Sequence, residues 1–342
     1  MNYPPVDLAY LRAISDCTGI LQHGTHSVPN RHLGYTTDDN ARALIIAVQH
    51  YEMTDERQDL DLAITYLSYL LHAQSPDRKF RNIMTFQRTF LDEEITEDCY
   101  GRTMWACGYT ASSELPLNVK IVAKRLFDES IGIATTLISP RAVAYSILGI
   151  CDYLRTDGHD QNLLSTLKTL ADYLIQRLHY SASDDWYWYE QYLTYGNAIL
   201  PLALLETART TGSDQYMEAA LRTARFLTEV LVQDGRLNII GNRGWYTRGE
   251  ERAVFDQQAI DAGYTVYLYT KAYDILRDKE YLDLAHIANE WFFGNNISKT
   301  WVYNPETTGC YDGINPEGVN LNQGAESTIC YLLAQIAMSR FK

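Results

Sequence analysis

The chain has no long apolar run and comparatively few basic residues. Nowhere in its 342 residues does an apolar stretch approach about 18 residues, the length that crosses a membrane, so we expect no transmembrane segment. Lys and Arg number 29 against 43 Asp and Glu, which gives a net charge of −14. A nucleic-acid binder needs a basic surface. The composition therefore disfavours a nucleic-acid partner and fits a neutral one, such as a sugar.

Cysteine is also sparse, and its six positions form no C-x-x-C pair, so the sequence does not predict a zinc knuckle. His23, His26 and His32 have no regular ligand spacing, and we expect neither a metal nor a cofactor. The N-terminal segment MNYPPVDLAYL lacks the basic and apolar regions of a signal peptide. Together with the scattered thiols, this favours a cytoplasmic location.

Strict alternation of apolar and polar residues is rare, whereas spacings of three and four residues recur along the chain. These spacings predict about twelve helices in two alternating sets. The more charged set covers residues 6–21, 59–74, 117–130, 161–179, 214–231 and 279–293. The set with few charges after its first turn covers residues 36–50, 96–109, 140–154, 197–211, 257–276 and 325–339.

The low-charge helices recur at intervals of about 44 to 68 residues, which is typical of stacked helical hairpins. A helix that is apolar all round is buried, whereas one with a polar face lies at the surface. Six hairpins with the low-charge helices inside make an (α/α)6 toroid, and we predict that residues 1–342 form one such all-α domain. In this ring the inner helices run parallel, so their N-termini gather at one mouth.

Five of the six inner N-termini carry carboxylates beside aromatic or amide side chains, and the third carries Arg141 instead. Asp38, Asp98 and Asp256 have an alternative interpretation as helix caps or first-turn acids. Arg42 follows Asp38 by four residues, which also predicts an ion pair within the helix. Caps alone do not account for neighbouring segments such as WYWYE (186–190) and NQGAE (322–326). Aromatic rings, amides and carboxylates at one mouth indicate a sugar-binding cleft.

Glycoside hydrolysis needs two carboxyl groups that flank one bond, about 6.5–9.5 Å apart in inverting enzymes. Neighbouring helices pack about 8–10 Å apart, so acids on different inner helices are in range. We predict Glu190 or Asp98 as the acid, because Glu190 follows an aromatic run that can keep a carboxyl protonated. Asp256 or Glu326 is the predicted base. The residues expected to bind substrate are Asp38, Asp39, Asn40, Arg141, Trp188, Tyr195, Trp245, Gln257, Asp261, Asp312 and Gln323.

The segments GYTTDDNARA, EDCYGR, WYEQYLTYGNAILP, FDQQAIDAG and YDGINPEGVNLNQGAEST resemble an uncharacterised bacterial family of (α/α)6 toroid proteins. The similarity covers roughly residues 6 to 340. It implies the toroid fold, a link to glycans with mannosides among the candidates, and an association with glycosyltransferases. In architecture the chain is more remotely similar to six-hairpin glycosidases.

The leading hypothesis is thus a metal-independent glycoside hydrolase acting on small oligosaccharides, with inversion favoured. Three alternatives stay open. A sugar epimerase would use His as acid and base, and only His23, His26 and His32 lie near the mouth. A phosphorylase would hold phosphate through Arg141 and Arg243. A glycan-binding toroid would keep the cleft without catalysis.

Overall fold

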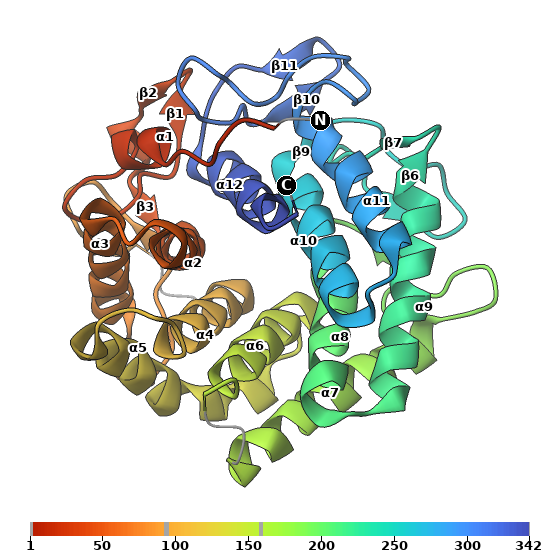
Figure 1. Ribbon diagram of the computed structural model, residues 1–342, viewed down its shortest axis with the longest axis horizontal. Helices are drawn as coiled ribbons and strands as arrows, with labels where there is room; N and C mark the ends of the chain where they lie inside the picture. Colours follow the sequence, from red (N-terminus) through yellow and green to blue (C-terminus); the bar gives the residue numbers. More distant parts are fainter. Residues whose placement is uncertain (1–2, 92–95, 157–159, 342) are drawn as a thin grey trace.

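The computed structural model describes residues 3–91, 96–156 and 160–341. Its helices form two concentric rings (Figure 1). The inner ring consists of α2 (Thr37–Thr54), α4 (Glu97–Ala111), α6 (Pro140–Tyr153), α8 (Ile199–Thr211), α10 (Ala259–Leu276) and α12 (Ala325–Ser339). The outer ring consists of α1 (Ala9–Ala13), α3 (Arg57–Ala73), α5 (Leu117–Ser130), α7 (Gln161–Ser181), α9 (Asp214–Leu231) and α11 (Lys279–Asn289). The predicted (α/α)6 toroid is confirmed.

The difference in charge between the two helix sets determines their positions. Every residue of α6 is buried, whereas α9 buries only one face, which includes Tyr216, Leu227 and Leu231. Each inner helix packs against the next one, and α12 packs against α2 and closes the ring. A helix with apolar residues on all sides is stable only where neighbours cover all of them. The inner ring provides that environment.

Helices α4 and α6 approach each other closely because both carry glycine at their contact. A Cβ atom added at Gly108 would lie 2.1 Å from the carbonyl oxygen of Gly149. A Cβ atom added at Gly149 would lie 2.4 Å from the carbonyl oxygen of Met104. No larger residue fits at either position without moving a backbone.

The helix predicted over residues 6–21 is much shorter in the structure, where α1 ends at Ala13. The chain turns instead at Asp16, whose backbone N–H donates to the carbonyl oxygen of Gly19 and whose side chain accepts from the backbone of Thr18. Asp side chains favour such turns over helix continuation. The last outer helix also ends early, and a 3₁₀ turn, η3 (Glu290–Phe292), completes it.

The loops contain short antiparallel pairs of β-strands, although the sequence shows almost no strand pattern. These strands are β1 (Gly24–Thr25), β2 (Val28–Pro29), β3 (Tyr35–Thr36), β4 (Ile83–Met84), β5 (Tyr192–Leu193), β6 (Val232–Gln233), β7 (Arg236–Leu237), β8 (Tyr246–Thr247), β9 (Gln257–Gln258), β10 (Gly313–Asn315) and β11 (Gly318–Asn320). Each has two or three residues, too few to show alternation. Two further 3₁₀ turns, η1 (Arg31–Leu33) and η2 (Ile131–Thr136), lie in connecting segments.

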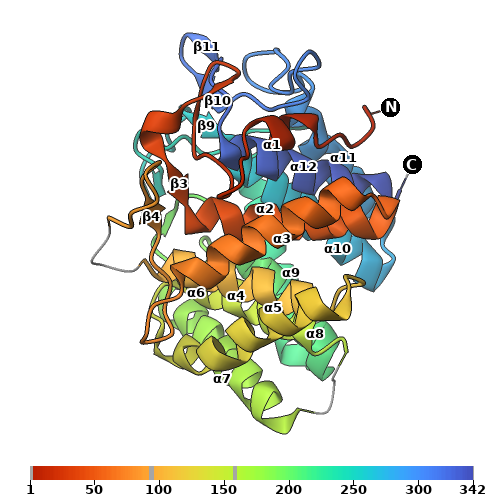
Figure 2. The ribbon, with the colours of Figure 1, turned by 90° about the vertical axis from the view of Figure 1, so that its left-hand side faces the viewer.

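The largest of these sheets has the order β11-β10-β9, with Gly313 opposite both Gln258 and Asn320. In the side view, β3, β4, β9, β10 and β11 lie at the side of the ring opposite the chain termini (Figure 2). Because β3 and β9 run directly into α2 and α10, this is the side where inner helices begin. Among the described residues, none of the helices has the length and apolar character needed to cross a membrane.

Candidate active site

A cleft with two lobes opens at the N-terminal ends of the inner helices. The closed lobe, of about 490 Å³, is the more enclosed; the open lobe measures about 870 Å³. The two lobes share five lining residues, Asp38, Asn82, Arg102, Gln258 and Glu326, which we call the waist. The remaining walls of the closed lobe are Gln22, His23, Thr36, Asp39, Arg42, Ile83, Asn242, Asp256, Ala259, Asp312, Gly313, Ile314, Asn315, Asn320, Gly324 and Ser327. Those of the open lobe are Thr96, Glu97, Asp98, Ile138, Ser139, Pro140, Arg141, Arg177, Glu190, Tyr192, Thr194, Tyr195 and Ile260.

Asp38 is tied to the neighbouring helix and loop. Its Oδ1 lies 2.9 Å from Nη1 of Arg102 on α4, and its Oδ2 accepts a hydrogen bond of 2.9 Å from Asn82. Arg102 also approaches Asp98, at 3.8 Å. The guanidinium therefore joins the first two inner helices at the cleft floor.

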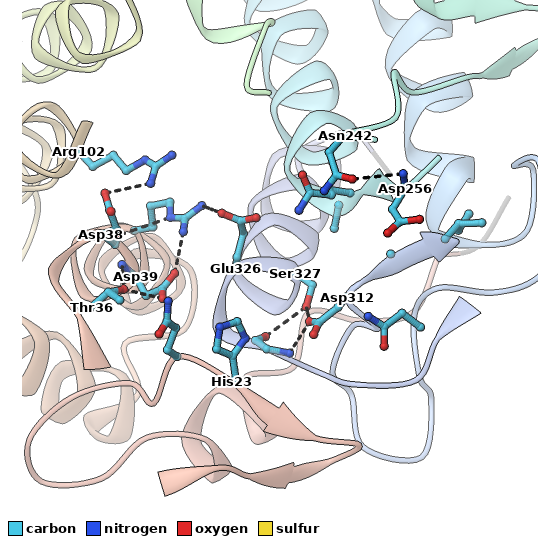
Figure 3. Close-up of a pocket in the computed structure, with 18 of the residues that line it drawn as sticks. His23, Thr36, Asp38, Asp39, Arg102, Asn242, Asp256, Asp312, Glu326 and Ser327 are labelled. Atoms are coloured by element: carbon cyan, nitrogen blue, oxygen red, sulfur yellow. Dashed lines mark hydrogen bonds and ion pairs between the residues drawn. The ribbon is translucent and has the colours of Figure 1, made fainter. Parts of the chain in front are cut away.

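Asp39, next to Asp38, makes a separate set of contacts. Its Oδ1 lies 2.7 Å from Nη2 of Arg42, whose Nη1 lies 3.0 Å from Oε2 of Glu326 (Figure 3). The predicted pair between Asp38 and Arg42 is therefore wrong, because successive helix positions point about 100° apart and Arg42 faces Asp39. The cap of α2 is Thr36, whose hydroxyl accepts from the backbone of Asp39.

Asp38 and Asp98 are first-turn acids of α2 and α4, which confirms that part of the alternative interpretation, but none of the three predicted residues is a cap. Asp98 lies inside α4, whose N-cap position is Thr96, and Asp256 precedes α10, whose N-cap position is Gln258. Neither helix has a side-chain cap. The carboxylates of Asp98 and Asp256 are thus left to other partners.

In the closed lobe, Asp312 and Asp256 contribute carboxyl groups from different loops (Figure 3). Oδ1 of Asp312 accepts hydrogen bonds from the backbone of Gly324 at 2.7 Å and from the Ser327 hydroxyl at 2.9 Å. Burial nevertheless raises the pKa of Asp312 above its ordinary value. Asp256 is more exposed, and its Oδ1 lies 3.0 Å from Nε of Arg243.

In the open lobe, the two predicted acids are both engaged. Asp98 accepts hydrogen bonds from Ser139 at 3.0 Å and from Tyr195 at 2.8 Å. Glu190 is buried, with Oε2 at 2.9 Å from Nη1 of Arg141. A carboxyl group that exchanges protons with substrate needs an oxygen that substrate can reach. Both oxygens of Asp98 accept hydrogen bonds, and Glu190 is only 4% exposed.

Arg141 does not offer a free guanidinium to a phosphate. Besides the ion pair with Glu190, it donates to the carbonyl oxygen of Tyr195 at 2.6 Å and to the hydroxyl of Thr194 at 2.7 Å. Its buried position and these partners show that it holds the loop before α8 in place. Arg243, the other predicted phosphate ligand, is paired with Asp256.

Six residues expected to bind substrate lie outside the walls of both lobes, and five of them are buried in the protein. Asn40 accepts from the backbone of Ile20, Gln257 accepts from Trp291, and the ring of Trp188 is fully buried. Gln323 and Asp261 are likewise buried and accept hydrogen bonds from other residues of the chain. Gln323 accepts from the hydroxyl of Thr307, and Asp261 accepts from Asn197 beneath the cleft floor. The amide and carboxyl groups of the other four residues bond within the protein, as buried polar groups usually do, whereas the indole N–H of Trp188 is buried without a hydrogen-bond partner.

Trp245 likewise does not line either lobe, but its ring packs 6.2 Å from the ring of Tyr195, which does. Of the predicted residues, Asp38, Asp39, Asp98, Arg141, Glu190, Tyr195, Asp256, Asp312 and Glu326 line the cleft. The geometry therefore brings together acids that are almost 300 residues apart along the chain.

Several lining residues were not predicted, namely Asn82, Arg102, Asn242, Asn315 and Asn320. Arg102 stood in the quoted segment EDCYGR, four residues after Asp98, and that spacing could have indicated it. The asparagines lie in loops and short strands, where no periodic pattern marks the side chains that face a cavity.

Comparison with known proteins supports the fold. A solved structure of a sugar epimerase from a ruminal bacterium has a TM-score of 0.76 and 12% identity, covering 98% of this chain and 97% of the epimerase. The cellobiose 2-epimerase of Spirochaeta thermophila has a TM-score of 0.72 and 13% identity, with 96% and 91% covered. An α-1,6-mannanase from a Salegentibacter species has a TM-score of 0.63 and 14% identity, with 98% and 96% covered. At such identities the likeness establishes the toroid fold only.

No family model and no curated protein sequence matches the chain.

Proposed function

We propose that the chain is a carbohydrate-active enzyme, and specifically a glycoside hydrolase that cleaves small oligosaccharides, with mannosides among the candidates. The observation that carries this proposal is the composition of the cleft. Carboxyl groups from several hairpins line it, whereas His23 is the single imidazole among its described lining residues. Hydrolysis of a glycosidic bond requires two carboxyl groups and no imidazole.

Within this proposal, Asp312 is the best candidate for the general acid. Burial raises its pKa, which favours the protonated form that an acid needs. Its Oδ1 is held by Gly324 and Ser327, which fixes the orientation of the carboxyl group. This assignment moves the acid from Glu190 or Asp98 to a residue first expected to bind substrate.

Glu326 and Asp256 remain the candidates for the base. The side chain of Glu326 is 39% exposed and lies at the waist, where water can reach it. In the reaction, a water oxygen attacks the anomeric carbon while the bond to the glycosidic oxygen breaks. The acid gives its proton to the departing oxygen, and the base takes a proton from the water.

The test is an assay of reducing-sugar release from manno-, gluco- and cello-oligosaccharides of two to five units. The wild-type enzyme should cleave at least one of these, and Asp312→Asn and Glu326→Gln should not. Loss of sugar binding in these variants would be a different defect, so binding is measured in parallel. Absence of cleavage of every sugar by folded wild-type protein contradicts the proposal.

A sugar epimerase is the second candidate. The epimerase structures have higher TM-scores than the mannanase, and His23 lies in the closed lobe near Asp312. An epimerase would remove a proton from the carbon beside the sugar carbonyl and return it on the other face. Deuterium entering that carbon from deuterated water, without bond cleavage, would identify this reaction.

A further inference from the structure

We infer that the enzyme acts at a chain end, with one terminal sugar unit in the closed lobe, the scissile bond at the waist and the rest of the oligosaccharide in the open lobe. This inference rests on the proposed function, because it assigns the parts of the same cleft. The evidence is the difference between the two lobes and the residues that they share.

The closed lobe is the smaller and the more enclosed of the two. The sheet β11-β10-β9 and the segment containing His23 form its walls. The smaller volume and greater enclosure of this lobe favour a terminal sugar unit there, with the rest of the chain in the open lobe.

The chemistry of the closed lobe also suits one sugar held by its hydroxyls. Its side chains include Asn242, Asn315, Asn320, Asp256 and Asp312, which offer amide and carboxylate groups. Such groups form directional hydrogen bonds with hydroxyls and specify orientation. The lobe thereby distinguishes one sugar from another.

The open lobe differs from the closed lobe in shape. It is larger and less enclosed, and two of its apolar side chains remain exposed, Ile138 at 75% and Tyr192 at 43%. Apolar faces of this kind pack against the C–H surfaces of sugar rings without fixing their hydroxyls. The lobe therefore tolerates chains of different lengths.

The waist joins the two lobes and carries Glu326, a candidate base, together with Asp38. A glycosidic bond between a unit in each lobe must cross this point. Glu326 is held there by Arg42, and Asp38 by Arg102, from two different inner helices. Cleavage at the waist releases a single sugar on each turnover.

The first test is the product pattern of the wild-type enzyme on trisaccharides, tetrasaccharides and pentasaccharides of the panel. The inference predicts that a monosaccharide and the chain shortened by one unit are the earliest products at every length. Early division of a tetrasaccharide into two disaccharides overturns it. Such division would leave the proposed hydrolase in place, so the two failures are distinguishable.

The second test measures binding of monosaccharides and trisaccharides to Glu326→Gln protein. Because this variant should not cleave the sugars, the contribution of each lobe to binding can be measured separately. Adding Tyr192→Ala should weaken trisaccharide binding by about two- to tenfold, the value of a ring contact, and leave monosaccharide binding unchanged. Adding His23→Ala should weaken the binding of both the monosaccharide and the trisaccharide, because His23 lines the closed lobe. The controls are Tyr180→Ala and His32→Ala, which alter exposed residues outside the cleft.

An equal loss of monosaccharide and trisaccharide binding in the Tyr192 variant overturns the assignment of the lobes. If the Tyr192 variant loses trisaccharide binding only, but the wild-type protein hydrolyses no sugar, the assignment of the lobes is supported and the proposed function is contradicted. Failure of every mono- and oligosaccharide to bind at millimolar concentration overturns both.

Discussion

Glu326 occupies the position where the two lobes meet, and its substitution is the sharpest test among single residues. Glu326→Gln keeps the shape of the side chain and removes the base, so kcat should fall by about 10²-fold or more. Stability should change little, because the side chain is 39% exposed. A matched control is Glu317→Gln, an exposed residue on the turn between β10 and β11. Equal activity of the two variants would remove Glu326 from the mechanism.

His23 separates the two candidate reactions at the same scale. A hydrolase that uses carboxyl groups should lose only affinity in His23→Ala, because the imidazole then contacts substrate without exchanging its protons. An epimerase that uses His23 as its acid or base should lose about 10²-fold or more in kcat. Steady-state kinetics of the variant, with His32→Ala as control, decide between a change in KM and a change in kcat.

Asp261 gives the folded protein a pH-dependent stability. Burial raises the pKa of Asp261 to about 7. The hydrogen bonds from the backbone and side chain of Asn197 lower this pKa, but by less than burial raises it. Between about pH 4 and pH 7 the unfolded chain releases a proton that the folded chain retains, so stability falls as the pH rises through this range. Below pH 4, Asp261 is protonated in both the folded and the unfolded chain, so it contributes no pH dependence. Above pH 7, the free energy of unfolding has fallen by its full amount, at most about 4 kcal/mol.

Asp261→Asn removes this titration. Its stability relative to wild type should therefore increase from pH 4 to pH 7 and then level off. Urea unfolding at a series of pH values measures the difference, with exposed Asp214→Asn as the control. A difference that is constant with pH would show that Asp261 does not hold its proton in the folded state.

At the scale of elements, the contact between α4 and α6 determines how closely these two inner helices approach. Gly108→Ala places a methyl group against the carbonyl oxygen of Gly149, and should destabilise the protein by about 1–3 kcal/mol. Gly132→Ala is the control, because a Cβ atom there meets nothing within 4 Å. Urea unfolding of the two variants compares them. Equal stabilities of the Gly108 and Gly132 variants would mean that α4 and α6 can move apart without a loss in the free energy of unfolding.

Elements that depend on periodic burial were predictable from the sequence, and those fixed by local turns were not. Helices α2, α6 and α12 carry few charges after their first turn and are buried around most of their circumference, and their positions followed from the low-charge pattern. The early end of α1 depends on one turn at Asp16, which competes with a helix pattern that continues beyond it. The short strands carry too few residues to show a period.

The same distinction applies to the site. Acids at helix starts, such as Asp38 and Glu326, were found because the toroid places those starts together. Trp188, Gln257 and Gln323 have the right chemical groups but turn into the protein, and side-chain direction in a loop leaves no mark in the sequence. The role of Arg42 was misread because a spacing of four residues fits Asp38, whereas the ion pair joins Asp39 at three.

At the scale of the whole molecule, the cleft is built from helices all around the ring, so ligand binding should stabilise the ring as a unit. A trisaccharide at a hundredfold excess over its Kd should add about 2.7 kcal/mol and raise the Tm by roughly 3–6 °C in a single transition. Scanning calorimetry measures both features. Two transitions, of which one shifts, would contradict the prediction that the chain forms one domain.

The central claim is that carboxyl groups gathered at the inner-helix N-termini cleave a glycosidic bond. Incubation of the wild-type enzyme with the oligosaccharide panel in deuterated water, followed by NMR of the sugars, tests it most directly. We expect new reducing ends, with no deuterium on the carbon next to the anomeric centre. Deuterium at that carbon in sugars whose glycosidic bonds are intact would contradict the claim and identify an epimerase.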